Sequence, residues 1–284
     1  MNKKVSIIIP CYNQGKYVSD AINSALKQTY NDIEIVVFND GSTDNSAEII
    51  KSFADKYNNI LFFDEKENKG VINARNMAIE AANGEYILPL DADDTIEPTY
   101  IEKAVKILKE NPNVGIVYCD ARMFGNKNKY WNLEDFDKSN FLYCNCIFVT
   151  ALFRKTDFLK VGMYKDCMQF GCEDYDLWLS FVEQGFDIYK IDEILFNYRQ
   201  YKEDSRTTIS IQNSETIWKA IIKNHIDLYL ADSQFIDRFR SNPKKLKKKY
   251  QKYKKLFNIF LPIIITESVL LIILVIRFLN WGIK

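Results

Sequence analysis

The first ninety residues alternate short apolar runs with segments of helical periodicity, and this alternation limits the possible folds more than any other feature. Four apolar runs have strand length and are bounded by turn residues. They cover residues 5–9, 33–38, 60–63 and 86–90. Between them, apolar residues recur at helical spacing over 18–26, 47–57 and 71–82. This βαβαβαβ order predicts an α/β fold with a mainly parallel sheet, whose ligands bind at the carboxyl ends of the strands.

The remainder of the chain is less regular. No internal repeat or low-complexity linker divides it. We predict helices over 101–110, 174–184 and 214–239, and strands over 115–118, 147–153 and 188–198. Residues 122–145 form a polar, aromatic-rich excursion. With 47% hydrophobic residues among 284, the chain has ample material for a large core.

The C-terminal tail differs from the rest of the chain in charge. Residues 241–284 carry ten Lys and Arg and one acidic residue, Glu267, which leaves 28 basic and 37 acidic residues before them. The lysine-rich segment 244–255 leads into a mostly apolar stretch, 256–281, which as a helix would reach about 39 Å. A hydrocarbon core is about 30 Å thick, so a span is possible. Pro262 and Glu267 oppose it, and an in-plane helix or a buried helix is the alternative. We expect a membrane anchor that holds the body at the cytoplasmic face of the cell membrane.

Composition also argues against several function classes. The acidic body disfavours a nucleic-acid platform. The six cysteines show no CxxC pair and no zinc spacing, and the single histidine, His225, nearly excludes a histidine-based triad or metal site. Neither GxGxxG nor GxxxxGK[ST] is present, so the dinucleotide and P-loop interpretations fall away.

The fourth predicted strand ends in three aspartates, Asp91, Asp93 and Asp94. Carboxylates packed this closely repel one another, and a cation relieves the repulsion. Carboxylate oxygens suit Mg²⁺ or Mn²⁺, which also hold substrate diphosphates. We therefore predict a metal-diphosphate site at the carboxyl end of this strand. The alternative is a solvated acidic turn that caps the helix starting near Pro98.

Three further polar blocks follow strands at the same edge of the predicted sheet. The first holds Pro10, Tyr12 and Asn13, which could offer backbone groups and an aromatic face to a base. Asp40 ends the second strand, where a carboxylate can accept from a base N–H or a ribose hydroxyl. Arg75, in the third block, could bind phosphate. Turns, helix caps and a solvated arginine are the alternatives at these positions.

Together these blocks closely resemble the family 2 glycosyltransferases of bacteria, which have the GT-A fold. The resemblance covers about residues 4–200, and four blocks in the same order carry it. They are VSIIIPCYN at 5–13, NDGSTD at 39–44, NKG with ARN within 68–76, and DADD at 91–94. The resemblance implies a nucleotide-sugar donor and inversion by direct displacement. It places Asp40 at the base and Arg75 near the diphosphate. Asp91 and Asp93 would serve a divalent cation, Mn²⁺ or Mg²⁺.

The same resemblance points to a catalytic base. Glu173 and Asp174 match the family's Glu-Asp motif at a helix start, and Asp174 takes the role of base for the acceptor hydroxyl. Favourable interaction of carboxylates with the helix dipole is the structural alternative. Gln14 departs from an acidic residue frequent in the family, and Gln200-Tyr201 stands where many relatives carry a histidine. Arg199 could still contact the diphosphate.

We therefore expect a GT-A domain over 1–205, with a nucleotide-sugar-binding half (1–95) and an acceptor half (96–205). A helical extension (206–243) and the basic, hydrophobic anchor (244–284) follow. The expected activity is metal-dependent, inverting transfer of a sugar, with UDP as carrier, to a glycan or lipid-linked acceptor in cell-surface polysaccharide synthesis. A homo-oligomer, in which Glu267 seeks a partner across chains, is the alternative to a monomer.

Two other functions fit parts of the sequence. The run YILPLDADDT also fits the DxDxT motif of haloacid-dehalogenase-like phosphatases, with Asp91 as nucleophile. That nucleophile usually opens its chain, whereas three βα units precede Asp91 here. The other alternative is a non-catalytic sugar-nucleotide-binding membrane protein, although every acidic candidate residue is present.

Overall fold

A computed structural model describes residues 4–131, 135–200 and 206–232. They belong to two compact units, one ending at Thr207 and the other beginning at Thr208. The boundaries predicted inside the first unit, between a donor half and an acceptor half, stay predictions.

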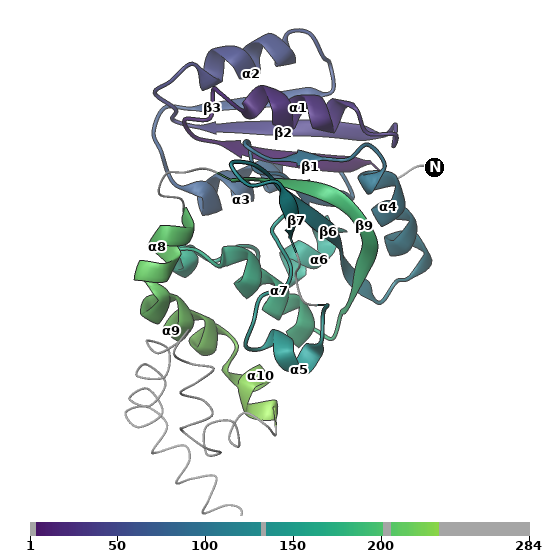
Figure 1. The fold of residues 1–284 in the computed structure, drawn as a ribbon, viewed down its shortest axis with the longest axis vertical. Helices are drawn as coiled ribbons and strands as arrows, with labels where there is room; N and C mark the ends of the chain where they lie inside the picture. Colours follow the sequence, from purple (N-terminus) through teal and green to yellow (C-terminus); the bar gives the residue numbers. More distant parts are fainter. Residues whose placement is uncertain (1–3, 132–134, 201–205, 233–284) are drawn as a thin grey trace, which may run out of the picture. The chain divides into compact units, whose positions relative to one another are not determined.

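The first unit begins with four parallel strands in the spatial order β3-β2-β1-β4. The strands are β1 (Val5–Cys11), β2 (Ile33–Asp40), β3 (Ile60–Glu65) and β4 (Tyr86–Pro89). The helices between them are α1 (Val18–Leu26), α2 (Ser46–Ala54) and α3 (Val71–Ala81). Figure 1 shows α1 and α2 together on one face of this sheet and α3 on the opposite face. The order of the strands reverses between β1 and β4, and such a switch point opens a crevice at the carboxyl ends of the two strands.

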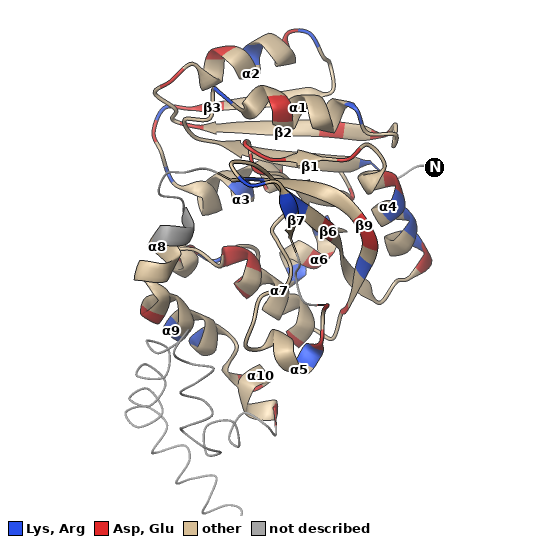
Figure 2. Cartoon of the chain, in the orientation of Figure 1, with Lys and Arg blue, Asp and Glu red and all other residues tan. Residues whose placement is uncertain are grey.

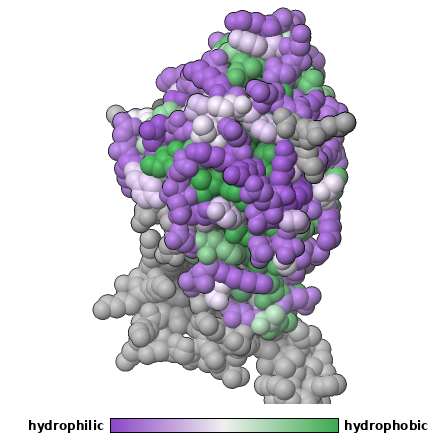
Figure 3. Space-filling model, turned by 90° about the vertical axis from the view of Figure 1, so that its right-hand side faces the viewer, coloured by the Kyte–Doolittle hydropathy of each residue, from purple (hydrophilic) through white to green (hydrophobic). Residues whose placement is uncertain are grey.

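Burial on both faces explains why these strands read as continuous apolar runs. All seven residues of β1 are buried, and β1 carries no charged residue. In Figure 2 it is accordingly drawn in tan, the colour of uncharged residues. Burying a side chain such as Ile7 or Ile9 stabilises the fold by about 1.5–3 kcal/mol. The face of the molecule shown in Figure 3 is mostly hydrophilic, with hydrophobic patches in between.

The sheet continues through the order β4-β8-β6-β9-β5, and β7 pairs with β6. These strands are β5 (Thr95–Ile96), β6 (Val114–Gly125), β7 (Lys129–Trp131), β8 (Leu152–Arg154) and β9 (Asp187–Gln200). The helices of this part are α4 (Tyr100–Glu110), α5 (Lys138–Phe141), α6 (Lys155–Lys160), the 3₁₀ turn η1 (Asp166–Met168) and α7 (Glu173–Glu183). β8 runs antiparallel to β4 and β6, whereas β6 and β9 are parallel. The predicted α/β class is confirmed.

The predicted strand over 147–153 is wrong for most of its length. Only Leu152 and Phe153 of that range join the sheet, in β8. The backbone N–H of Ala151 donates to the carbonyl of Val149, and this tight turn interrupts the extended chain. Residues 147–151 are nevertheless buried, so their apolar character reflects burial and not a strand.

The second unit contains most of α8 (Arg206–Gln212), together with α9 (Ser214–Asn224) and α10 (Ile226–Ala231). Helix was predicted over 214–239, and the described part of that range is helical apart from His225, where α9 and α10 meet, and Asp232. On α9, Ile217 and Ile221 lie one turn apart and are both buried. Among the described residues, no helix is both long enough and apolar enough to cross a membrane. The predicted anchor, 244–284, lies outside the described residues.

Candidate active site

The loops that follow β1 and β2 are joined by side-chain hydrogen bonds. The backbone N–H of Asn13 donates to Ser42 Oγ at 2.9 Å, and Asn13 Oδ1 accepts from the Thr43 N–H at 2.8 Å. Asn13 adopts a left-handed φ of 52°, a conformation that Asn tolerates better than most residues. The N–H of Gly15 adds a bond to Asp44 Oδ2 at 2.9 Å. Asn13 therefore fixes the shape of the crevice wall.

Asp40 joins the loop that follows β2 to the loop that follows β3. It is the last residue of β2 and is almost completely buried. Its two carboxylate oxygens accept from the backbone N–H groups of Lys69 and Gly70, each at 2.8 Å. A carboxylate oxygen has a second lone pair, so these bonds leave acceptor capacity at Asp40. Its predicted contact with a nucleotide base stays a prediction.

The loops after β2 and β3 approach each other closely, and this depends on two glycines. Gly41 has φ +67°, and a Cβ atom there would lie 2.7 Å from the backbone nitrogen of Asn68. Gly70 has φ 90° and ψ 155°, a region of backbone conformation that is almost restricted to glycine. The loop before α3 therefore follows a path that the Asn-Lys-Gly sequence permits and that Asp40 fixes.

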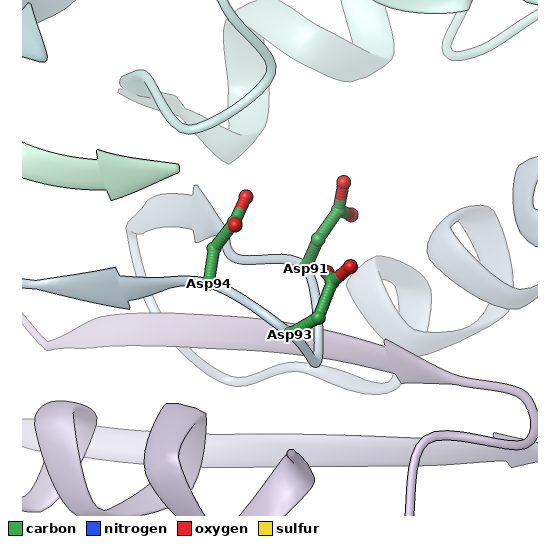
Figure 4. Close-up of side chains that lie close together, drawn as sticks. All are labelled: Asp91, Asp93 and Asp94. Atoms are coloured by element: carbon green, nitrogen blue, oxygen red, sulfur yellow. The ribbon is translucent and has the colours of Figure 1, made fainter. Parts of the chain in front are cut away.

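The acidic loop between β4 and β5 gathers three carboxylates at the switch point. Asp91, Asp93 and Asp94 each offer an oxygen, and these oxygens lie within 4.8 Å of one another. Figure 4 shows the three carboxylates pointing to the same side of the loop. Burial, followed by the charges of Asp93 and Asp91, raises the pKa of Asp94 well above its ordinary value. A set of oxygen ligands under such repulsion fits a hard divalent cation such as Mg²⁺ or Mn²⁺.

Arg199, near the end of β9, is hydrogen-bonded to the acidic loop. Its backbone N–H donates to Asp94 Oδ1 and its Nε donates to the carbonyl of Asp93, both at 2.7 Å. The guanidinium reaches Asp20 on α1 at 2.8 Å. It also lies over the rings of Tyr17 and Phe124, 4.6 and 4.3 Å from their centroids. These contacts place Arg199 beside the predicted metal ligands.

Arg75 on α3 lies between the acidic loop and the start of α7. Its Nη2 donates to Asp91 Oδ1 at 2.5 Å and its Nη1 donates to Glu173 Oε1 at 2.6 Å. The side chain is buried, with only 1% of Arg75 exposed. Burial opposes the charged form, but the charges of Asp91 and Glu173 outweigh it and raise the pKa of Arg75. The guanidinium therefore stays charged and joins a residue of the acidic loop to the predicted base region.

Glu173 and Asp174 occupy the first turn of α7, as predicted. Cys172, just before them, has a left-handed φ of 61°. Asp174 is partly exposed, and its Oδ1 accepts from the N–H of Tyr175 at 2.7 Å. Burial, and after it the charges of Glu173, Asp174 and Asp91, raise the pKa of Tyr164, although Arg75 opposes this. The charges of Asp174, Arg75 and Asp91 therefore all act on the same residue, Tyr164.

The structure thus brings most of the predicted residues to one edge of the sheet. Pro10 is buried within β1, beside Phe38 of β2, and Tyr12 is 46% exposed just beyond the strand. The sequence analysis missed Tyr164, because a lone tyrosine in an irregular loop carries no signal. It quoted Asn76 without a role, yet Asn76 Nδ2 donates to the Tyr164 carbonyl at 2.9 Å.

A cavity of about 440 Å³ lies elsewhere, among β5, β6, β7 and β9. Arg122, Tyr130 and Asn197 are among its lining residues. None of the predicted site residues lines it.

Comparison with known proteins gives consistent matches. The sequence matches the family described as glycosyl transferase family 2 over residues 6–172. An uncharacterised glycosyltransferase of Rickettsia typhi is 35% identical over 235 residues, which cover 77% of this chain and 71% of the relative. The glycosyltransferase GlyG of Streptococcus pneumoniae is 34% identical over 143 residues, 50% of this chain and 44% of that protein.

Two solved structures are similar in fold. TarS 1–349 of S. aureus in complex with UDP-GlcNAc aligns with a TM-score of 0.67 at 19% identity, covering 86% of this chain and 74% of that one. The chain spans 44% of a longer TarS structure. The mannosyltransferase PcManGT of Pyrobaculum calidifontis, in complex with GDP-Man and Mn²⁺, aligns with a TM-score of 0.60 at 19% identity. It covers 81% of this chain and 71% of the mannosyltransferase. These likenesses confirm the predicted GT-A fold.

Proposed function

Because this chain belongs to glycosyl transferase family 2, we propose that it moves a hexose from a nucleotide-sugar donor to a glycan or lipid-linked acceptor, with inversion and with a divalent cation. The observation that carries the proposal is the acidic cluster Asp91, Asp93 and Asp94 at the β1–β4 switch point, joined through Arg75 to the start of α7. Family membership overturns the interpretation of Asp91 as a phosphatase nucleophile.

Asp91 and Asp93 would hold the cation, Mn²⁺ or Mg²⁺. When bound, the cation neutralises charge on the departing diphosphate. Asp94 is buried and bonded to Arg199, so its part is to fix the shape of the loop. The carboxylate oxygens of the cluster and the Mn²⁺ in the mannosyltransferase complex support this assignment.

The donor would lie along the carboxyl ends of β1 and β2. Asp40 would accept from the base or ribose, with Tyr12 as an aromatic face and Pro10 and Asn13 shaping the wall. Arg199 would be near the diphosphate. UDP-GlcNAc in TarS and GDP-Man in the mannosyltransferase support a nucleotide sugar as donor class. We propose UDP as the carrier.

Asp174 would deprotonate the acceptor hydroxyl as that oxygen attacks the anomeric carbon. A base must lie within about 2.6–3.2 Å of the oxygen it deprotonates. Asp174 is partly exposed at the helix start, whereas the neighbouring Glu173 is buried against Arg75. This difference supports Asp174 as the base and assigns Glu173 to the framework that positions it.

Transfer of label from a panel of radiolabelled nucleotide sugars tests the proposal, with membrane extract as the source of acceptors. We expect incorporation with Mn²⁺ and its loss with EDTA. The Asp93→Ala variant should abolish metal-dependent transfer, whereas Asp55→Ala, an exposed aspartate at the end of α2, should match the wild type. Equal transfer by Asp93→Ala and wild type would remove the cluster from the mechanism.

We also propose that the basic and apolar tail, 244–284, attaches the enzyme to the cytoplasmic face of the cell membrane. The ten basic residues beyond residue 240 support attraction to anionic lipid. Deletion of 244–284 should release an active enzyme into the soluble fraction after cell lysis. A truncated enzyme that still sediments with membranes would contradict this attachment.

A further inference from the structure

Arg75 forms ion pairs with two carboxylates that lie far apart in the sequence. Asp91 is 16 residues from it and Glu173 is 98 residues from it. Only 1% of Arg75 and 5% of Glu173 are exposed. Each ion pair uses a different terminal nitrogen, so the planar fork of the guanidinium sets the spacing of the two carboxylates.

The residue after Arg75 reinforces this arrangement. Asn76 Nδ2 donates to the Tyr164 carbonyl at 2.9 Å, and its Oδ1 accepts from the Tyr164 N–H at 3.2 Å. The ring centroid of Tyr164 lies 5.7 Å from the Arg75 guanidinium carbon. Two consecutive residues of α3 therefore fix the acidic loop, the start of α7 and the chain between α6 and η1.

We propose that Arg75 is a positioning residue, which holds the cation-binding carboxylate of Asp91 at a fixed distance from Glu173 and hence from the base Asp174. The roles of Asp91 and Asp174 rest on the function proposed above. A guanidinium this deeply buried acts on a bound donor through the carboxylates that it holds. This role differs from the direct diphosphate contact that the family resemblance implies.

Asp91 keeps one carboxylate oxygen for a cation while Arg75 binds the other. Residues that orient a metal ligand in this way typically change metal affinity or activity about 10- to 100-fold when they are replaced. Lysine keeps the charge but presents a single ammonium group, which cannot reproduce contacts from two separate nitrogens of a planar fork to two carboxylates. The proposal therefore distinguishes Arg from Lys at this position.

The test uses the full chain with Arg75→Lys, Glu173→Gln and the double variant. The affinity for Mn²⁺ is measured from the EPR signal of the free ion, and the affinity for UDP is measured in EDTA. We expect Arg75→Lys to weaken Mn²⁺ binding at least tenfold while UDP affinity in EDTA stays within twofold of wild type. The transfer rate of the double variant should be no lower than that of the worse single variant, because both changes break one linkage.

Arg154→Lys is the matched control. Arg154 is also largely buried and donates to the carbonyls of Val114 and Leu108, away from the acidic loop. This control should leave Mn²⁺ affinity unchanged even if it lowers the melting temperature. If Arg75→Lys does not fold, Glu173→Gln carries the test alone, with a loss of transfer at retained UDP affinity expected.

Three results would overturn the proposal. They are Mn²⁺ affinity within twofold of wild type in Arg75→Lys, a parallel loss of UDP affinity in EDTA, and multiplicative losses in the double variant. The second would instead make Arg75 a direct diphosphate ligand. Failure of the proposed function gives a different pattern, since Mn²⁺ binding by the wild type would then still depend on Asp91 and Arg75, yet no sugar would be transferred from any donor.

Discussion

The buried carboxylate of Asp94 accepts a 2.7 Å hydrogen bond from the backbone N–H of Arg199, although 105 residues separate the two. The Arg199 side chain then donates to the carbonyl of Asp93 and pairs with Asp20. The end of β9 thereby fixes the acidic loop, and Asp20 on α1 holds the Arg199 side chain in place. The loop that carries the predicted metal ligands is held by backbone and side chain of one residue.

Arg199→Ala tests how much the side chain contributes. The variant keeps the bond from its backbone N–H but loses a hydrogen bond worth about 1 kcal/mol, a partly exposed ion pair and two cation–π contacts. We expect the free energy of unfolding in urea to fall by about 2–3 kcal/mol. Arg122→Ala, which removes a more exposed pair with Glu97 and a hydrogen bond to Asn197, should cost about 1 kcal/mol. Equal losses in the two variants would contradict anchoring by Arg199.

Glu34 should make the stability of the sheet depend on pH. Burial alone would raise the pKa of Glu34, but hydrogen bonds from Ser6 Oγ and from Asn83, together with Lys4, lower it below the ordinary value. A carboxyl whose pKa is lower in the folded state stabilises the fold above its unfolded pKa of about 4.3. That contribution is lost as the pH falls through the lower, folded pKa.

Glu34→Gln should therefore cost about 1–3 kcal/mol near pH 7, and the deficit should shrink as the pH falls below about 4. Urea denaturation at a series of pH values measures the deficit. Glu110→Gln, at the exposed end of α4, is the control and should show little deficit at any pH. A deficit at Glu34 that is constant across this range would show that ionisation is not its source.

Gly41 and Gly162 give a matched pair for the close approach of the loops. Both have positive φ, +67° and +95°, but only at Gly41 would a Cβ meet backbone, that of Glu67 and Asn68 at 2.7 Å. Gly162→Ala should cost about 1–2 kcal/mol from backbone conformation alone. Gly41→Ala should cost more than about 4 kcal/mol, or prevent folding, as measured by thermal denaturation. Similar losses at the two glycines would argue that the loop before α3 can move away.

Asp174→Asn should separate catalysis from donor binding. The amide is nearly isosteric with the carboxylate but cannot accept the acceptor proton, so kcat should fall about 10²–10⁴-fold. UDP affinity, measured by calorimetry with Mn²⁺, should stay within about twofold of wild type, because the base contacts the acceptor. Asp187→Asn, at an exposed position at the start of β9, should be fully active. Loss of UDP affinity in Asp174→Asn would contradict the base assignment.

Sequence alone predicted the four parallel strands well, because burial on both faces leaves uninterrupted apolar runs such as β1. It could not predict the two-residue strand β5, which forms only because Ile96 and Phe196 meet in the fold. The hairpin of β6 and β7 could not be predicted for a related reason, since Arg122 and Lys129 interrupt the apolar pattern of these strands. The strand predicted over 147–153 failed because buried irregular chain and buried strand have the same composition.

The predicted site residues were identified by motif and by position at strand ends, and the structure gathers most of them at one edge. Their partners were not predictable. The sequence of α3 alone does not distinguish Arg75 from a surface arginine. Its partner Glu173 lies on α7, 98 residues later. Arg199 is likewise an ordinary strand residue until β9 lies beside the acidic loop. Long-range pairing of this kind leaves no local pattern in a sequence.

The two partners of Arg75 become available at different times during synthesis. Asp91 emerges from the ribosome only 16 residues after Arg75, so both members of this ion pair are present before the later half of the unit is made. Glu173 follows 98 residues after Arg75 and supplies the second carboxylate that balances the guanidinium charge. An uncompensated buried charge is costly, and Asp91 supplies Arg75 with a counter-ion while Glu173 is still missing. The carboxylate on α7 is therefore added to an ion pair that the first ninety-one residues already contain.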